Sequence, residues 1–441
     1  MKRGDTMDNI DNYDVLVIGG GIGGMETALN LGDMGFRVLL IEKSPSIGGK
    51  MISLSKVFPT LDCASCISTP KMASVMHHPM ITVLTYSEID EIKKDGNVFI
   101  VKITKKPRYV KEDACTGCGQ CEMACPVVVP DEYNLGLVGR KAAYIPFANA
   151  SPKIALIDLD HCVLCGMCER VCPAKAIDFS QHPENINIKV KSIVIATGFN
   201  LFPAEKVPNL GFGKFKNVIT SMQMERLLSP TRPFNTVLRP SDGKVPSKIA
   251  YIQCVGSRDK TLGNPICSQV CCMYAIKQAQ LLLGALPLAE VTIFYIDIRA
   301  FGKGFEEFYN QAKDMGIRFV KGKVAKIEEK ENGNLILKYE DIENSGKLVK
   351  EEFDLVVLSV GLLPSNDIIT KLKDLKLELD EVSYIKSFDT LHPTKTNIPG
   401  IFVAGTAFGP KDIPDTINSA GDAACEVAEY IRLNWGNKNG K

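Results

Sequence analysis

The chain has 441 residues, of which 45% are hydrophobic, and its formal net charge is +1. This length allows two or three domains with sizeable cores, and the near-neutral charge gives no electrostatic reason to expect binding of nucleic acid or an anionic membrane. No apolar run of spanning length and no signal pattern stands out. We therefore expect no direct membrane insertion and a cytoplasmic location, with a peripheral place on a membrane complex as the alternative.

The first predicted unit, residues 13–44, is a strand, a glycine-rich turn, a helix and a second strand. Gly19, Gly21 and Gly24 form a G-x-G-x-x-G turn, and Glu42 closes the next strand. Such glycines let a helix N-terminus approach a pyrophosphate, and an acid at this spacing binds ribose hydroxyls. The pattern predicts a dinucleotide site, with a glycine turn that binds nothing as the alternative.

Later segments indicate an α/β chain in which domains interrupt one another. We expect a FAD-binding domain in three parts (1–106, 182–244 and 366–441), an inserted ferredoxin domain (107–181) and a unit like a nicotinamide-binding domain (245–365). Further FAD contacts are expected from residues that follow strands or open the last helix: Lys43, Gly49, Lys50, Ala196, Thr197, Gly198, Gly405, Thr406, Asp415 and Thr416.

The insert contains two C-x-x-C-x-x-C-x-x-x-C-P runs, the spacing of bacterial two-cluster ferredoxins. In that arrangement three cysteines of each run bind one [4Fe–4S] cluster and the fourth binds the other. One predicted cluster has the ligands Cys115, Cys118, Cys121 and Cys172, and the other has Cys125, Cys162, Cys165 and Cys168. Zinc is the alternative, although the fourth cysteine and the proline after it fit iron–sulfur better.

A third cysteine group follows the strand KIAYIQ, where a nicotinamide domain would have a glycine-rich phosphate turn. Cys254, Cys267, Cys271 and Cys272 give the pattern C-x12-C-x3-C-C, and the last two begin a predicted helix. Because a helix N-terminus favours thiolates, we interpret this group as the site of a third [4Fe–4S] cluster that takes the place of the nicotinamide. Four buried or disulfide-bonded cysteines are the alternative. Fifteen cysteines in a chain without an export signal favour metal or redox use.

Several stretches resemble the A subunits of heterodisulfide reductases, an iron–sulfur flavoprotein family: DCASCISTPKM, CTGCGQCEMACPVVVPDEYNLGLVGRKAAYIPF, CVGSRD, CSQVCCMYAIKQ, FYIDIRAFGKGFEEFY and GPKDIPDTI. The resemblance implies a two-domain thioredoxin-reductase-like FAD/NAD(P)-type Rossmann fold with an inserted two-cluster ferredoxin domain, and FAD beside the third cluster. It also implies that Lys277 lies near the flavin N5, where its charge would stabilise the reduced flavin.

The family also implies a homodimeric core that carries other heterodisulfide-reductase-like subunits, with a ferredoxin or a hydrogenase- or formate-dehydrogenase-type protein as electron donor. The chain looks like a short form, without the extra cysteine-bearing domain before the flavin fold and the second ferredoxin domain after it. The electron-transfer contacts that these two domains would provide are then absent or come from another polypeptide. The expected function is to split or relay flavin electron pairs through the clusters to ferredoxin, a disulfide-reducing partner or a quinone-linked partner.

Two other functions remain open. An NAD(P)H-dependent, ferredoxin-linked oxidoreductase would need a second glycine-rich turn near residues 251–260, and a non-catalytic electron wire would hold an inert flavin. Cys63 and Cys66 are a candidate redox dithiol or extra cluster ligands, with a packing or flavin-proximal role favoured over both. Cys425 is expected in the core of the last helix, and Arg299 in a structural salt bridge.

Overall fold

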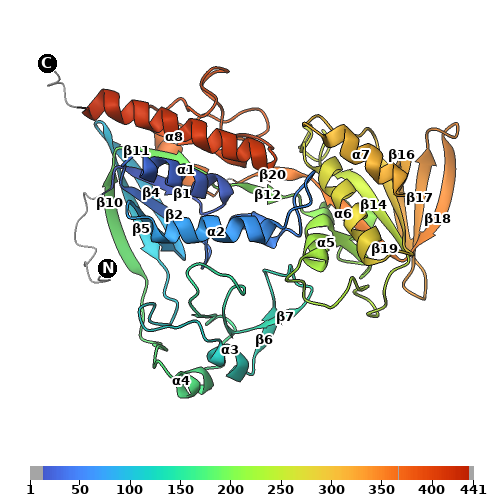
Figure 1. Cartoon of the computed structure of the whole chain (residues 1–441), viewed down its shortest axis with the longest axis horizontal. Helices are drawn as coiled ribbons and strands as arrows, with labels where there is room; N and C mark the ends of the chain where they lie inside the picture. Colours follow the sequence, from blue (N-terminus) through green and yellow to red (C-terminus); the bar gives the residue numbers. More distant parts are fainter. Residues whose placement is uncertain (1–12, 366, 437–441) are drawn as a thin grey trace.

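The computed structural model describes residues 13–365 and 367–436. Figure 1 shows two α/β units side by side, with the cysteine-rich insert projecting from the first unit and lying below both. None of the helices in the described ranges is both long and apolar enough to cross a membrane.

The first unit is built on a parallel sheet whose strands are buried on both faces. Across this sheet the strands run in the order β21 (Ile401–Val403), β11 (Ser192–Ile195), β1 (Val15–Ile18), β2 (Val38–Glu42) and β3 (Ile81–Thr85). Alternate side chains of a strand point to opposite faces. Val15 and Val17 therefore pack toward helices, whereas Leu16 and Ile18 pack against a second sheet.

Three helices and an antiparallel sheet complete the layers of this unit. The helices are α1 (Ile22–Asp33), α2 (Ala64–His77) and α8 (Ile413–Trp435). The three-stranded sheet has the order β10 (Glu184–Val190), β5 (Val98–Lys105) and β4 (Ser87–Asp95). Residues far apart in the sequence thus share one core, and α8 lies along α1 in Figure 1.

The second unit has a seven-stranded sheet with helices on one face. The strand order is β13 (Val218–Thr220), β19 (Leu355–Val360), β14 (Lys248–Val255), β15 (Glu290–Tyr295), β16 (Arg318–Glu329), β17 (Leu335–Asp341) and β18 (Lys347–Phe353). The first five are parallel, and β16 to β18 form an antiparallel meander. The helices are α5 (Ser221–Leu228), α6 (Cys271–Ala285) and α7 (Phe305–Asp314).

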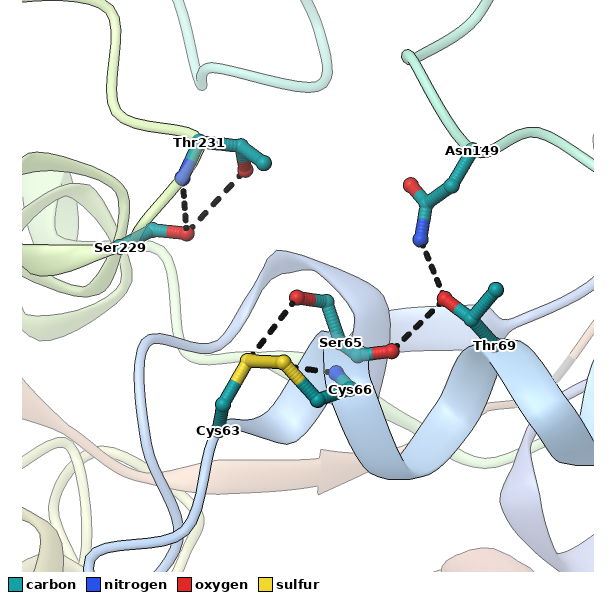
Figure 2. The surroundings of a disulfide bond; sticks show 7 residues. All are labelled: Cys63, Ser65, Cys66, Thr69, Asn149, Ser229 and Thr231. Atoms are coloured by element: carbon teal, nitrogen blue, oxygen red, sulfur yellow. Dashed lines mark hydrogen bonds between the residues drawn. A yellow bond between two sulfur atoms is a disulfide. The ribbon is translucent and has the colours of Figure 1, made fainter.

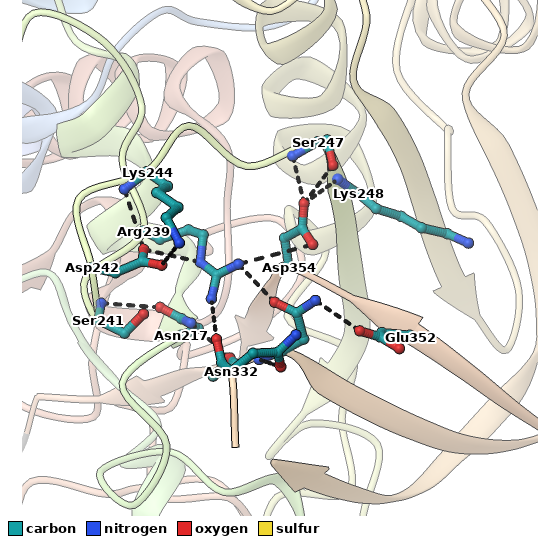
Figure 3. A network of polar contacts seen from close by, with 12 residues as sticks. Asn217, Arg239, Ser241, Asp242, Lys244, Ser247, Lys248, Asn332, Glu352 and Asp354 are labelled. Atoms are coloured by element: carbon teal, nitrogen blue, oxygen red, sulfur yellow. Dashed lines mark hydrogen bonds and ion pairs between the residues drawn. The ribbon is translucent and has the colours of Figure 1, made fainter. Parts of the chain in front are cut away.

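A polar network fixes the edge of this second sheet where the connecting segment enters it (Figure 3). Asp354 accepts hydrogen bonds from the backbone N–H groups of Ser247, at 2.7 Å, and Lys248, at 3.1 Å. Arg239 donates to Asn334 at 2.7 Å, and Asn217 donates to the Gly333 carbonyl at 2.8 Å. These bonds tie the segment before β14 to the β16–β17 turn and so set the position from which β14 runs toward Cys254.

The insert lies between β5 and β10 and has little regular structure. Its elements are α3 (Gln120–Ala124), α4 (Met167–Val171), β6 (Val128–Pro130), β7 (Gly139–Lys141), β8 (Ala143–Tyr144) and β9 (Leu156–Ile157). Each short helix follows a glycine with positive φ, Gly119 at 77° and Gly166 at 71°. Such a turn is open to glycine at little cost, and it reverses the chain between neighbouring cysteines.

Short elements complete the chain and join its units. β12 (Phe199–Leu201) pairs antiparallel with β20 (Leu362–Pro364), which links the end of the first unit's strand β11 to the end of the second unit's strand β19. The 3₁₀ turns are η1 (Gly49–Ser53), η2 (Ala204–Lys206), η3 (Pro208–Leu210), η4 (Ile369–Lys371), η5 (Lys373–Leu375) and η6 (Gly405–Phe408).

Two neighbouring charged residues of α5, Glu225 and Arg226, are buried where the three parts of the molecule meet. Glu225 forms an ion pair with Lys277 of α6 and accepts hydrogen bonds from the backbone and hydroxyl of Ser55, at 2.8 and 2.6 Å. Arg226 donates to Asn134 of the insert at 3.0 Å, and its guanidinium lies 4.2 Å from the ring centre of Tyr133. The pair therefore holds both units and the insert together.

The expectation for Cys425 is wrong, because its side chain is exposed. The buried face of α8 carries Ala420, Ala423, Ala424 and Val427, which recur at helical spacing. Cys425 follows that face by one position and so points away from the core. The salt bridge expected for Arg299 is present, with Asp297 at 3.6 Å.

We predict that Glu225→Gln lowers the free energy of unfolding by about 3–5 kcal/mol, because removing one partner leaves the Lys277 ammonium buried without its counter-charge. Urea unfolding of the purified chain measures this. The matched control is Glu378→Gln, which breaks an exposed pair with Lys386 and should change stability by about 1 kcal/mol or less. Equal stability of the two variants would contradict the role given to Glu225.

Candidate functional site

The glycine turn after β1 packs against other parts of the chain on two sides and is open on a third. A Cβ on Gly19, whose φ is +108°, would lie 2.4 Å from the Ala196 carbonyl oxygen, and one on Gly24 would lie 1.8 Å from that of Gly19. A Cβ on Gly21 would meet only the Gly49 Cα, at 3.8 Å. Packing therefore explains two of the glycines, whereas the third keeps clear the space in which a pyrophosphate would lie.

Glu42, at the end of β2, is anchored beside this turn. Its carboxylate accepts the N–H of Gly20 at 2.7 Å and that of Ser44 at 2.8 Å, and the side chain is buried. Both carboxylate oxygens thus accept backbone N–H groups, and the predicted contact of Glu42 with a ribose stays a prediction. Lys43 instead forms an exposed salt bridge with Asp367, and the Lys50 ammonium lies 4.9 Å from the ring centre of Phe199.

Loops after β11 and β21 and the start of α8 close the other side of the turn. A Cβ on Gly405 would lie 3.0 Å from Thr416 Cγ2, and one on Gly23 would lie 3.3 Å from the same atom. A Cβ on Gly198 would lie 4.0 Å from Thr406 Oγ1. The structure thus brings the predicted FAD residues of all three FAD-domain parts into one region.

One polar atom in this region has no partner. The Oγ1 atom of Thr197 is buried and has no hydrogen bond within the described residues. Buried polar atoms are nearly always satisfied, so this hydroxyl and the open side of Gly21 both fit a polar ligand such as FAD. At the start of α8 the carboxylate of Asp412 accepts the N–H of Asp415 at 2.9 Å, so Asp412 caps the helix.

The insert contains two cavities, each lined by four cysteines drawn from both runs. Cys125, Cys162, Cys165 and Cys168 line about 320 Å³ of space that is partly open to solvent. Cys115, Cys118, Cys121 and Cys172 line a second cavity of about 350 Å³, also partly open. Each set combines three cysteines of one run with the fourth of the other, which is the grouping that crossed ligation requires.

Backbone hydrogen bonds reach the sulfurs of both sets of cysteines. In the described part of the chain, no group of three or more His, Cys, Asp or Glu side chains is arranged to hold a metal ion. Backbone N–H groups of Leu164 and Ala176 donate to the sulfurs of Cys162 and Cys172, at 3.4 and 3.3 Å. Burial raises the pKa of Cys121 to about 11, so binding of iron would have to displace its proton.

A hairpin brings the third cysteine group together. The backbones of Arg258 and Ile266 are joined by a 2.9 Å hydrogen bond, and Asp259 and Asn264 bond in both directions. This hairpin folds the spacer between Cys254 and Cys267 back on itself, so that Cys267 returns toward Cys254 and the chain then enters α6 at Cys271. The twelve residues between Cys254 and Cys267 thus form a loop that the hairpin hydrogen bonds close.

Contacts of α6 place its first two cysteines beside the end of β14. The Cys271 sulfur donates to the Val360 carbonyl at 3.8 Å, and Val360 pairs with Val255, the residue after Cys254. Burial is the main cause that raises the pKa of Cys271 and of Cys272, the latter to about 11. All four are free thiols, so no disulfide joins any two of them. The backbone N–H of Gln269 donates to the Cys267 sulfur at 3.3 Å.

The turn after β14 is packed against an aromatic ring. Gly256 has φ +70°, and a Cβ there would lie 2.0 Å from the ring of Phe202. The ring therefore fills the space beside the one glycine of this turn, at the place where a nicotinamide domain would have a glycine-rich phosphate turn.

Lys277 is buried in α6 and its ammonium contacts two protein groups. It forms the ion pair with Glu225 and donates to the Lys56 carbonyl at 2.8 Å. Burial lowers its pKa, and the charge of Glu225 opposes that effect. Its predicted place beside the flavin N5 stays a prediction.

Cys63 and Cys66 form a disulfide at the start of α2 (Figure 2). Cys63 caps the helix, because its sulfur accepts the N–H of Cys66 at 3.2 Å. Figure 2 shows the bond facing residues from other parts of the chain, among them Asn149 of the insert and Thr231 after α5. The two cysteines are therefore bonded to each other, and Cys66 is exposed.

Sequence reasoning missed three residues of this region: Glu225, Arg258 and Asp297. Glu225 contacts Lys277, and Arg258 pairs with Asp297 next to the third cysteine group. The sequence offered little to find Glu225, because only the folded structure shows that this helical acid is buried. Arg258 lies in the quoted stretch CVGSRD but received no role.

Comparison with known families matches three regions of the chain. The pyridine nucleotide-disulphide oxidoreductase family matches residues 163–424, the FAD dependent oxidoreductase family matches 14–104, and the 4Fe-4S dicluster domain matches 114–177. These matches support FAD and iron–sulfur clusters as the cofactors.

Curated relatives cover nearly the whole chain. The A subunit of the H(2)/formate:CoB-CoM heterodisulfide,ferredoxin reductase of Methanococcus maripaludis is 50% identical over 94% of this chain, and the match covers 63% of that protein. The A subunit of the ferredoxin:CoB-CoM heterodisulfide reductase of Methanosarcina mazei is 42% identical over 95% of this chain and 53% of its own length. The chain therefore spans less than two thirds of the length of these relatives.

Solved structures show the fold. Thioredoxin reductases from Lactococcus lactis and T. acidophilum align over 96% of this chain and 99% of their own, each with a TM-score of 0.55 and with 17% and 16% identity. The predicted thioredoxin-reductase-like architecture with a ferredoxin-type insert is thus confirmed.

We predict that Gly21→Ala weakens FAD binding by at least about tenfold, or about 1.4 kcal/mol, because the new Cβ enters the space left for the pyrophosphate. Thermal unfolding of the FAD-free variant should match the FAD-free parent, since no protein atom lies within 3.4 Å of that Cβ. Fluorescence titration with FAD measures the affinity. Unchanged affinity would remove Gly21 from the predicted site. Gly24→Ala, which clashes with the Gly19 carbonyl, should instead lower stability.

Proposed function

The chain belongs to the pyridine nucleotide-disulphide oxidoreductase family and is homologous to the A subunits of heterodisulfide reductases. From this premise we propose that it is the flavin and iron–sulfur electron-transfer subunit of a heterodisulfide-reductase-like complex. When bound, FAD would exchange electron pairs and the clusters single electrons. The residues of the chain bind these groups, hold them near one another and set their potentials.

The observation that carries the proposal lies at the end of β14. A nicotinamide domain would end this strand in a glycine-rich turn, whereas this strand contains Cys254, and Cys267, Cys271 and Cys272 are folded toward it. Phe202 fills the space beside the one glycine of the turn. We infer that the second unit binds a third [4Fe–4S] cluster and exchanges electrons with the flavin through it.

The two cavities of the insert give a route toward partners. Cys118 and Cys165 are exposed, and the exposed apolar residues Val163 and Leu164 immediately precede Cys165. By analogy with the names of the relatives, the partners are other heterodisulfide-reductase-like subunits together with a ferredoxin or a hydrogenase- or formate-dehydrogenase-type donor. The family resemblance adds a homodimeric core. Isolation of the native complex and identification of the proteins that co-purify test this assembly.

Two measurements separate the proposal from NAD(P)H-dependent reduction and from an inert electron wire. Anaerobic titration of the flavin-loaded chain with NADH and with NADPH should leave the flavin oxidised, because the turn after β14 is packed against Phe202. Rapid stoichiometric bleaching would favour the nicotinamide-dependent function. Absence of flavin reduction by ferredoxin and by the donor of the native complex, with assembly intact, would favour the wire.

We predict that replacing Cys271 and Cys272 together by serine removes about four irons per chain, since one cubane needs four thiolates. Iron analysis of anaerobically reconstituted protein measures this. Cys425→Ser is the matched control, because that cysteine is exposed on α8 and should leave the iron content unchanged. An unchanged count in the double variant would remove the third cluster from the proposal.

We also expect Lys277→Gln to shift the flavin midpoint potential to more negative values, because an ammonium near the flavin favours its reduced, anionic form. Spectroscopic redox titration measures the shift. The shift should be reduced by the ion pair that Lys277 already forms with Glu225. An unaltered potential would reject the placement of Lys277 beside the flavin.

A further inference from the structure

Arg258 is held in a fixed position next to the third cysteine group. Its backbone is in the left-handed region at φ +59°, as is that of Cys254 at +60°, and its N–H is bound to the Ile266 carbonyl at 2.9 Å. Left-handed backbone is uncommon for residues other than glycine and persists where the surrounding structure enforces it. The hairpin thus fixes the direction in which the Arg258 side chain leaves the turn.

The guanidinium of Arg258 is held at this group by an acid. It forms an ion pair with the carboxylate of Asp297, in the loop after β15. The N–H of Ser257, the residue before Arg258, donates to the Cys254 carbonyl at 3.3 Å, so Arg258 directly follows the turn that Cys254 begins. The Arg258 side chain is 23% exposed.

Asp297 borders the same group from the other side. Its backbone carbonyl accepts the Cys272 thiol at 3.7 Å, and its side chain is 45% exposed. Cys271 has a different partner, the Val360 carbonyl at 3.8 Å. Arg258 and Asp297 thus lie as a cation and an anion at the side of the group that carries Cys272.

The reduction potential of an iron–sulfur cluster depends on its net charge, its exposure to solvent and the hydrogen bonds to its sulfurs. A nearby cation that donates to a ligand sulfur favours the more negative, reduced cluster, and a nearby carboxylate favours the oxidised one. We propose that Arg258 and Asp297 set the potential of the cluster held by Cys254, Cys267, Cys271 and Cys272, Arg258 raising it and Asp297 lowering it. This inference rests on the third cluster of the proposed function.

The pairing also explains why the two residues belong together. An unpaired arginine would raise the potential by its full charge, and an unpaired aspartate would repel the anionic cluster and the thiolates that bind it. Paired, they cancel most of each other's long-range charge while both stay next to the group. Arg299 extends the pair at the exposed edge, since its Nε lies 3.6 Å from the Asp297 carboxylate.

The test is a redox titration of the reconstituted full chain, followed by electron paramagnetic resonance, for Arg258→Gln, Asp297→Asn and the double variant. At a fixed potential near the midpoint, Arg258→Gln should lower the ratio of reduced to oxidised third cluster by about tenfold, a shift of about 59 mV to more negative values for one electron. Asp297→Asn should shift the midpoint in the opposite direction, and the double variant should lie between the two. Arg258→Lys keeps the charge and should restore most of the parent value.

Two results would overturn the inference. One is a midpoint that neither single variant changes while each retains the parent's iron content, and the other is a shift of the same sign in both. A residue that only supports the hairpin would change iron content or stability without such opposite shifts. If Arg258→Gln loses iron, the midpoint potentials of Arg258→Lys and Asp297→Asn still test the inference.

The failure of the proposed function would look different. If Cys271→Ser with Cys272→Ser leaves both the iron content and the resonance signals of the parent unchanged, the third cluster itself is absent. A parent chain that shows the third signal, together with variants that do not move its midpoint, leaves the proposed function intact and removes only the roles of Arg258 and Asp297.

Discussion

The arrangement of the whole molecule depends on two adjacent buried residues of opposite charge, Glu225 and Arg226, each of which contacts other parts of the chain. Helix α5 is only two turns long, yet its two charges face different parts of the chain. Glu225 joins α6 to the loop at Ser55, and Arg226 joins the insert at Asn134 to the Ser53 carbonyl at 3.4 Å. Buried charges are costly unless they are paired and hydrogen-bonded, so each of these contacts must form together with the others. The relative position of flavin domain, insert and second unit is thereby fixed.

This constraint matters for electron transfer because the proposed cofactor sites lie on different parts. The FAD residues belong to the first unit, two cysteine groups belong to the insert, and the third group starts α6. The helix that begins with Cys271 and Cys272 carries Lys277 and Gln278 one to two turns later, and both contact Glu225. The same helix thus connects the third cysteine group to the anchor of the other two parts.

Sequence patterns were sufficient where function depends on residue type and spacing. The glycines, the acid at the end of β2 and the two ferredoxin runs could be read directly, and α6 begins at the predicted Cys271. Patterns failed where function depends on contacts between distant segments. Glu225 and Lys277 are separated by 52 residues, and Arg258 and Asp297 by 39. No short-range spacing pattern in the sequence relates residues this far apart, and only the folded sheets bring the partners together. Cys425 was misplaced because one residue of shift on a helix changes the face by about 100°.

The burial of the three cysteine groups differs in a way that suits their proposed roles. Cys271 and Cys272 are each 5% exposed, whereas Cys118 and Cys165 of the insert are exposed. Exposure to solvent is one of the factors that set the potential of a cluster, and a partner can approach a cluster only where the protein over it is thin. In the proposed function these groups would divide the work: the third group would exchange electrons within the chain, and the groups of the insert would exchange them with other proteins. The charged pair at Arg258 and Asp297 lies at the outer edge of the third group, with side chains 23% and 45% exposed, so water screens part of its effect on the potential.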